Sequence, residues 1–281
     1  MRGYALPFGR ARPRLRAGAL ARRVNIPLIS SLAADTAEAE PTPGGARPVR
    51  GLLDGSGQEA QILPQKNPPA AAWFDSSCRR CPRLAGFLEG VRAAHPDYHA
   101  APVAPFGSER SELLIVGLAP GMHGANRTGR PFTGDYAGVL LYRTLHRHGF
   151  ANQPNGAEPD DGLKLVRCRI SNAVKCLPPE NKPTGPEIVE CNRYLAAELK
   201  ALAKLRVILA LGRVAHGAVL RALALKPAAY PFGHGSEHLL PDGRTLFGSY
   251  HCSRYNTQTR RLTDDMFDSV IARVAQRLAA G

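Results

Sequence analysis

The sequence feature that most constrains the fold is a series of short apolar runs, each separated from the next by an amphipathic segment. Residues 112–117 (ELLIVG) end in glycine, and residues 206–211 (RVILAL) are followed by one. Apolar runs of this length, with little polar alternation, are typical of strands that are buried on both faces of a parallel sheet. Residues 165–174 and 245–250 are two further expected strands.

Helical segments lie between these strands. The apolar spacing predicts helices over residues 83–95, 136–148, 184–203, 213–223 and 263–278. Thr184 and Glu187 form a possible capping box at the start of the third of these helices. Strands that alternate with helices form βαβ units, so we expect an α/β fold. The predicted architecture is a three-layer α/β/α sandwich with a central, mainly parallel four-stranded sheet.

Composition separates the beginning of the chain from the rest. The 281 residues carry a formal net charge of +14, and the first 50 hold nine Arg, no Lys and three acids. Because this part has no sustained apolar period, we expect residues 1–65 to be a disordered basic extension and residues 66–281 to form the domain. An arginine-rich arm that binds DNA and a transit peptide are alternatives for the extension.

The charge also bears on the partner of the protein. An excess of basic residues of this size favours a polyanionic partner such as nucleic acid, although a solvated basic surface has the same composition. No apolar stretch of the sequence reaches 18 residues, so we expect no membrane span.

Three polar features follow expected strands. They are a glycine-rich segment over residues 117–135 (GLAPGMHGANRTGRPFTGD), Asn172 near the end of the second strand, and His251 after the last strand. In open parallel sheets, ligands bind at the carboxyl ends of the strands. The glycine-rich segment lacks the Gly-Lys-Ser/Thr of a phosphate-binding Walker loop and the spacing of a dinucleotide-binding loop. It is either a functional loop or an ordinary long connection.

Four of the six cysteines form a candidate metal site. Cys78 and Cys81 are a C-x2-C pair, whereas 14 residues separate Cys176 from Cys191. Four thiolates can hold zinc or an iron–sulfur cluster, although zinc usually prefers a second close pair. Cys191 also falls on an apolar helical stripe, so a small buried hydrophobe is its alternative role. We expect Cys168 to be a core residue and Cys252 to be a loop thiol.

Together, these segments resemble the motifs of a known family. Residues 117–135 resemble the first motif of the type B (family 5) uracil-DNA glycosylases. Residues 171–176 (SNAVKC) resemble the second motif, and residues 251–258 (HCSRYNTQ) resemble the third, which is the DNA-intercalating loop. The resemblance spans residues 78–262. Cys252 departs from the family pattern, which has proline after the histidine.

The resemblance implies a fold, an activity and a cofactor. It implies a uracil-DNA glycosylase-like fold and a monofunctional enzyme of DNA base-excision repair. Such an enzyme flips uracil and other deaminated bases, hypoxanthine among them, out of double-stranded DNA and hydrolyses the N-glycosidic bond. It further implies a [4Fe–4S] cluster on Cys78, Cys81, Cys176 and Cys191. On this basis we expect a monomer in the bacterial cytoplasm, associated with the nucleoid.

Three residues are the catalytic candidates. Asp135 would assist the attacking water, His251 would donate as a neutral imidazole to the leaving base, and Asn172 would bind the edge of the base. The alternative roles are a helix N-cap for Asp135, a surface or core histidine for His251, and a turn cap for Asn172.

The remaining candidates contact the base or the DNA. The base-binding candidates are Gly117, Ala119, Pro120, Gly121 and Phe132, and Phe132 is alternatively a core residue. Arg127, Arg130 and Lys175 are candidates for phosphate contacts, with Arg130 and Lys175 alternatively solvated. The residues expected to enter the duplex are Arg254, Tyr255, Asn256 and Gln258.

Two rival classes of function fit the same sequence. One is a non-catalytic nucleic-acid-binding module that retains the glycine loop and the cluster. The other is an unrelated enzyme that uses the glycine loop to bind a nucleotide or a phosphate ester.

Overall fold

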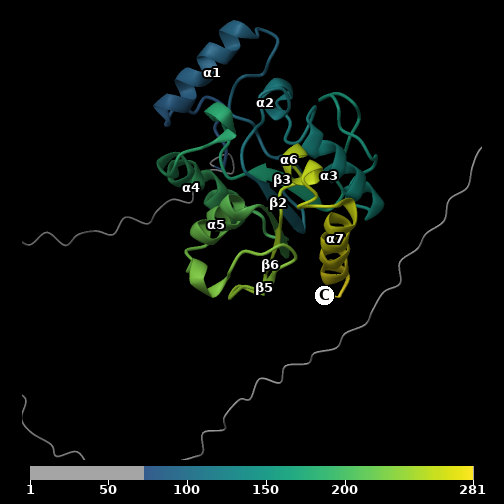
Figure 1. The fold of residues 1–281 in the computed structure, drawn as a ribbon. Helices are drawn as coiled ribbons and strands as arrows, with labels where there is room; N and C mark the ends of the chain where they lie inside the picture. Colours follow the sequence, from purple (N-terminus) through teal and green to yellow (C-terminus); the bar gives the residue numbers. More distant parts are fainter. Residues whose placement is uncertain (1–72, 281) are drawn as a thin grey trace, which may run out of the picture. The chain divides into compact units, whose positions relative to one another are not determined.

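The structure is a computed structural model that describes residues 73–280 (Figure 1). The expected basic extension, residues 1–65, lies outside the described residues. Within the described range, no helix combines the length and the hydropathy that are needed to cross a membrane.

A mixed sheet forms the centre of the fold, with the strand order β1-β3-β2-β4-β6-β5. Its central strands are β3 (Cys168–Asn172), β2 (Leu113–Gly117), β4 (Val207–Leu211) and β6 (Thr245–Ser249), and all of them run parallel. Every residue of these four strands is buried. The uninterrupted apolar runs predict this for β2 and β4, whereas β3 (CRISN) buries polar side chains as well. The expected parallel core is therefore confirmed.

The expected number of strands is corrected from four to six. The additional edge strands, β1 (Phe106–Gly107) and β5 (Glu237–Leu239), pair antiparallel with β3 and β6. Both are only two or three residues long and neither is buried throughout, so neither leaves an apolar run in the sequence. They become strands because the exposed edges of the parallel core offer hydrogen-bond partners.

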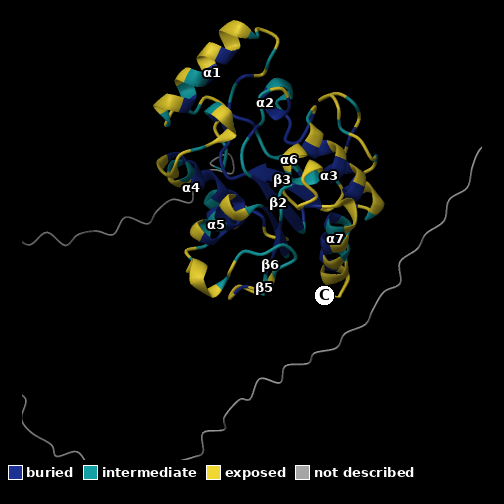
Figure 2. Cartoon of the chain, in the orientation of Figure 1, coloured by how far each residue is buried: buried dark blue, intermediate teal, exposed yellow. Residues whose placement is uncertain are grey.

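Helices cover both faces of the sheet. Helices α3 (Tyr136–Arg147) and α7 (Asp264–Ala279) lie on one face, whereas α4 (Gly185–Ala201) and α5 (Arg213–Ala222) lie on the other (Figure 1). Alternate residues of β2 show this division, since Leu113 belongs to the α3 and α7 core and Leu114 to the other. The three-layer prediction is confirmed, and Figure 2 shows the buried sheet between helices with exposed outer faces.

The remaining helices are short or peripheral. Helix α1 (Pro82–Ala94) precedes the sheet, and η1 (Pro179–Asn181) and η2 (Pro227–Ala229) are single 3-10 turns. Helices α2 (Ala125–Thr128) and α6 (Arg254–Gln258) lie in segments that the sequence analysis treats as loops. The capping box that Thr184 and Glu187 predict is present at the start of α4.

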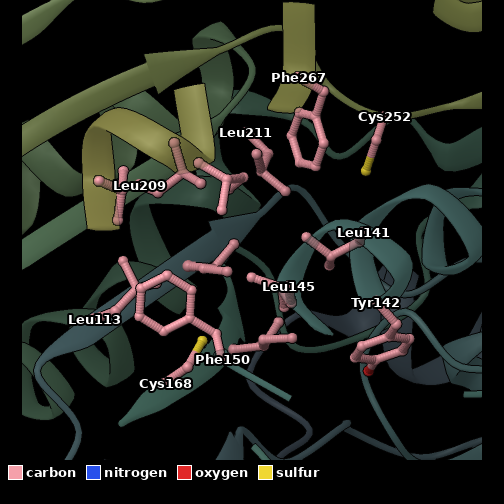
Figure 3. Packing of buried hydrophobic residues seen from close by; sticks show 14 of the residues in the cluster. Leu113, Leu141, Tyr142, Leu145, Phe150, Cys168, Leu209, Leu211, Cys252 and Phe267 are labelled. Carbon is pink, nitrogen blue, oxygen red and sulfur yellow. The ribbon is translucent and has the colours of Figure 1, made fainter. Parts of the chain in front are cut away.

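The two other cysteines lie in the core between the sheet and α3 (Figure 3). Cys168 is fully buried, as expected for a core residue. Cys252 lies in the loop after β6, as expected, but its thiol is fully buried in the same cluster as Phe267. The thiol packs inward beside His251, in the segment that follows β6, so it is part of the support of that residue rather than of the surface.

Candidate active site

A cavity of about 430 Å³ lies at the carboxyl ends of the parallel strands. Its volume falls within the range of small-molecule pockets, ~300–1,000 Å³. The segments that follow β2, β3 and β6 all contribute to it. The residues that line this cavity are Leu118, Ala119, Gly121, Ala125, Phe132, Asp135, Tyr136, Ala137, Asn172, Asn181, His251, Ser253 and Arg254.

Asp135 lies on this cavity at the start of α3. Its Oδ1 accepts a hydrogen bond of 2.9 Å from the backbone N–H of Gly138, so the expected N-cap is present. Burial raises the pKa of Asp135, while backbone hydrogen bonds at the helix start oppose the shift. A methyl group on Gly124 would lie only 2.5 Å from Asp135 Oδ2, so the glycine lets the loop pass close to the carboxylate.

His251 faces the same cavity from the far end of the chain. Its ring stacks on the ring of Phe132, with centroids 5.7 Å apart and planes at 25°. Loss of hydration lowers the pKa of His251 to about 4, so its imidazole is neutral at pH 7. The Asn256 amide donates to the carbonyl oxygen of His251 over 2.8 Å and fixes the backbone at this point.

Phe132 and Asn172 line the cavity, whereas Gly117, a further base-binding candidate, lies against both side chains without lining it. Gly117 pairs with Asn172 across β2 and β3. A methyl group on Gly117 would lie 2.5 Å from Asn172 Oδ1 and 2.9 Å from Phe132 Cζ, so only glycine leaves room for both side chains. Phe132 has a φ of +55°, a strained conformation for a residue other than glycine, and this turns its ring toward His251.

The other base-binding candidates divide into two groups. Ala119 and Gly121 line the cavity, whereas Pro120 is buried between them and does not. Phe132 lines the cavity and also belongs to the core, so its two expected locations coincide.

Asn181 is a cavity residue that the sequence analysis does not identify. It lies in the 3-10 turn η1, and both Glu180 and Asn181 have a φ above +50°. The only sequence signal for Asn181 is its place in a proline-rich segment between Cys176 and Cys191. Tyr136, which is 42% exposed, also joins the wall of the cavity.

Two of the expected phosphate contacts are corrected. Arg130 is buried, where it pairs with Asp161 over 2.8 Å and donates to Thr133. Lys175 is also buried, and its ammonium group pairs with Glu198. Both cations form ion pairs with acidic side chains inside the protein, so neither is available to a phosphate.

Arg127 stays at the surface, with its side chain about one-third exposed. It pairs with Glu158 through both terminal nitrogens. Because Glu158 is itself more than half exposed, this is a surface pair that a phosphate can replace.

The expected intercalating segment forms helix α6, which Ser253 caps. Tyr255 is 70% exposed, and Gln258 is exposed as well. Arg254 lines the cavity, with its guanidinium carbon 5.3 Å from the centre of the Tyr136 ring. Asn256 instead points inward to the carbonyl of His251, so it supports the site.

The four candidate ligand cysteines come together at a separate hollow. Cys78, Cys81, Cys176 and Cys191 all line it, beside the start of α1 and the middle of α4. Burial, with a contribution from the neighbouring thiols, raises the pKa of Cys81 to about 11 and that of Cys176 to about 12.

The four thiols that line this hollow have the donor chemistry of an iron–sulfur cluster. Among residues 73–280, no three Cys, His, Asp or Glu side chains gather closely enough to hold a single metal ion. In a [4Fe–4S] cluster each thiolate binds a different iron, so the four sulfurs surround the group at a wider spacing. The backbone N–H of Lys175 donates to Cys191 Sγ over 3.2 Å, a contact that suits a thiolate ligand.

Comparison with known proteins identifies the class to which this fold and site belong. The chain belongs to the Uracil DNA glycosylase superfamily, whose family model matches residues 104–275. Within that superfamily the chain is 47% identical over 209 residues to the Type-5 uracil-DNA glycosylase of Thermus thermophilus, which covers 73% of this chain and 94% of the relative. The Type-5 enzyme of Pyrobaculum aerophilum is 40% identical over 213 residues, 72% of this chain and 92% of its own. The Type-4 enzyme of Archaeoglobus fulgidus is 36% identical over 140 residues, half of this chain and 56% of its own.

Proposed function

We propose that this chain is a monofunctional uracil-DNA glycosylase that removes uracil from DNA in base-excision repair and leaves an abasic site. The observation that carries the proposal is that Asp135, Asn172 and His251 share one cavity, in a chain 47% identical to a Type-5 uracil-DNA glycosylase. The rival reading as a non-catalytic binding module is not favoured by these relatives.

The cavity requires that the target base leave the duplex. An atom inside the stack cannot reach Asp135 or His251, so the nucleotide is extruded into the cavity before the reaction. The Phe132 ring then lies against the base, and the side-chain amides of Asn172 and Asn181 meet its polar edge. An amide both donates and accepts, so this wall also accepts hypoxanthine, and we extend the proposed substrates to deaminated purines.

Bond breaking places positive charge on the sugar and negative charge on the departing base. The neutral imidazole of His251 donates a hydrogen bond to the base oxygen where the negative charge develops. The Asp135 carboxylate lines the same cavity, where it stabilises the positive sugar and accepts a proton from the attacking water.

The test is a duplex with one uracil, incubated with the protein and then cleaved at abasic sites by alkali. Strand breaks at the uracil are expected for the wild type, and Asp135→Asn and His251→Gln should lose them while still binding the duplex. The same assay with hypoxanthine tests the wider substrate range. Absence of breaks at uracil and at every other deaminated base would refute the proposal.

We propose that Cys78, Cys81, Cys176 and Cys191 hold a [4Fe–4S] cluster. When bound, such a cluster cross-links chain segments and carries one-electron redox chemistry. Here the four thiols connect α1 and α4 with the segment that follows Asn172. We therefore assign these cysteines a structural role, which keeps the wall that contains Asn181 in place.

Iron analysis tests this assignment. The purified protein should be brown and contain about four iron atoms per chain. Cys176→Ala should lose both the colour and the iron, whereas Cys168→Ala, which removes a buried thiol outside the hollow, should keep them. A colourless protein that contains zinc and retains full activity would refute the cluster.

We further propose that the protein acts as a monomer on double-stranded DNA, at the nucleoid in the bacterial cytoplasm. Light scattering with and without a uracil-containing duplex should give the mass of one chain per duplex. A fluorescent fusion should coincide with the stained chromosome.

A further inference from the structure

A buried ionic network connects the strand that ends at the active-site cavity with the hollow of the four cysteines. The Lys175 ammonium group donates to Ser171 Oγ and pairs with the Glu198 carboxylate over 3.3 Å. Glu198 also accepts hydrogen bonds from Ser171 Oγ over 2.6 Å and from Arg169 Nε over 2.7 Å. All four residues are at most 3% exposed, so water does not compete for these contacts.

The two ends of this network reach the two sites. Ser171 directly precedes Asn172, which lines the active-site cavity. Lys175 lines the hollow and directly precedes Cys176. The backbone N–H of Lys175 also donates to Cys191 Sγ over 3.2 Å. A turn of a few residues therefore joins the base-binding amide to a thiol of the hollow.

The Lys175 side chain closes this turn. On one side the turn is bound to the segment at the end of β2, because Ala173 N–H donates to the carbonyl oxygen of Gly117 and Val174 N–H to that of Leu118, each over 2.9 Å. On the other side, the bond from the ammonium group returns to a residue four positions earlier, on β3. Since these contacts are buried, loss of the ammonium group moves the backbone that carries Asn172 instead of being replaced by water.

The network also carries an excess of positive charge toward the hollow. Two cations, Lys175 and Arg169, share the single carboxylate of Glu198. A group held by four thiolates has a net negative charge, and its reduction makes that charge larger. Positive charge nearby and N–H bonds to sulfur stabilise the more negative form. Lys175 supplies both, so its presence raises the reduction potential of a cluster in the hollow.

We propose that Lys175 is a positioning residue that couples the cysteine-held cluster to the base-binding amide of Asn172. Its ammonium group fixes the turn on the side of the active site, and its backbone N–H fixes the same turn on the side of the cluster. The inference rests on the proposed glycosylase function and the proposed cluster. It adds that one buried lysine sets both the rate of excision and the potential of the cluster.

Lys175→Met tests the first effect, because methionine keeps an unbranched side chain and removes the charge. Glu198 retains Arg169 as its ion partner in this variant. Single-turnover excision of uracil from a duplex should slow about 10- to 100-fold, as expected when a positioned group is displaced by ~1 Å. Affinity for the duplex should not change, because Lys175 is buried and does not face the DNA.

Voltammetry of the iron-loaded protein tests the second effect. Lys175→Met should shift the reduction potential to a more negative value by about 59 mV, which corresponds to a tenfold lower ratio of reduced to oxidised protein for one electron. Ser171→Ala is the second variant, and it decides the question if Lys175→Met does not retain iron. It removes the acceptor of the ammonium group without changing any charge, so both the rate and the potential should fall, each by less than in Lys175→Met.

Thr245→Val is the matched control. Thr245 is 2% exposed and accepts a hydrogen bond from Arg277 Nε over 3.0 Å. It begins β6, at the end of the strand opposite to the cavity, so its replacement removes a buried hydrogen bond without disturbing either site. The control should keep the excision rate and the potential of the wild type. Thermal unfolding of every variant fixes a common assay temperature at which all of them are folded.

The coupling requires that rate and potential change together. A slower excision with an unchanged potential, a shifted potential with an unchanged rate, or wild-type values of both would overturn it. Equal losses in Thr245→Val would also overturn it, because they would show an effect of stability alone. The wild type is measured first: no excision of uracil would refute the glycosylase function, and no iron would refute the cluster, whereas a wild type that has both leaves the coupling as the only claim under test.

Discussion

Replacement of Glu198 by glutamine should destabilise the protein more than any exposed charge change on the same helix. The Glu198 carboxylate accepts hydrogen bonds from Arg169 Nε over 2.7 Å and from Ser171 Oγ over 2.6 Å. It also pairs with Lys175 Nζ over 3.3 Å. All four residues are at most 3% exposed, so the two cations have no water to replace the carboxylate.

The size of the effect follows from this burial. Removal of one partner from a buried ion pair costs about 3–5 kcal/mol, because the remaining charge stays in a medium of low polarity. For a domain of about 200 residues, each kcal/mol lowers Tm by about 2–4 °C. Glu198→Gln should therefore lower Tm by roughly 6–20 °C.

Thermal unfolding followed by circular dichroism measures this effect. Glu190→Gln is the matched control, because Glu190 also lies on α4 but its side chain is 38% exposed and pairs with Arg80 at the surface. Surface pairs contribute about 0–1 kcal/mol, so the control should lose at most ~4 °C. If Glu198→Gln unfolds within that same interval, the buried network does not stabilise the fold as argued.

Three further changes test the site. Burial raises the pKa of Asp135, so the stability that its protonated form contributes is present below its ordinary pKa and is lost as pH rises through the raised value. Asp135→Asn keeps a side chain that can cap α3, so its Tm at pH 7 should be no lower than that of the wild type. Its kcat should fall about 100-fold or more, because the carboxylate that accepts the proton is lost. A lower Tm with a normal kcat would contradict this. His251, with a pKa of about 4, should show no titration of its imidazole protons between about pH 5.5 and 8 in NMR spectra of the wild type. A titrating signal in that range that is absent from the spectrum of His251→Gln would contradict this. Gly117→Ala places a methyl group 2.5 Å from Asn172 Oδ1 and so displaces that side chain. Single-turnover excision should slow at least tenfold, with duplex affinity kept within about twofold. An unchanged rate would mean that the base does not bind against Asn172.

Local patterns in the sequence determined the elements of the fold. The apolar runs predict β2 and β4, because a strand covered on both faces has no polar alternation. The parallel strands β3 and β6 also lie within the expected strand segments, although β3 alternates polar and apolar residues. The capping box at Thr184 is equally local, since its two side chains are three residues apart. The edge strands β1 and β5 were missed because short exposed segments pair only after the parallel core exists.

The sequence indicated candidate residues for the site but not which of their charges stay at the surface. Arg127, Arg130 and Lys175 are all basic residues within the motif segments 117–135 and 171–176, yet only Arg127 stays at the surface. Composition cannot distinguish them, because burial depends on acids far away in the chain. Lys175 and its partner Glu198, for example, are 23 residues apart.

The chain order of strands and motifs by itself determined the class of fold, the edge of the sheet where ligands bind and the candidate residues there. Only the tertiary structure decided which of them face one another. It placed the imidazole of His251 against Phe132, 119 positions earlier in the chain, and brought Asn181 into the cavity. The physical reason is that periodicity reports which face of an element is buried, whereas contacts between loops depend on how distant elements pack.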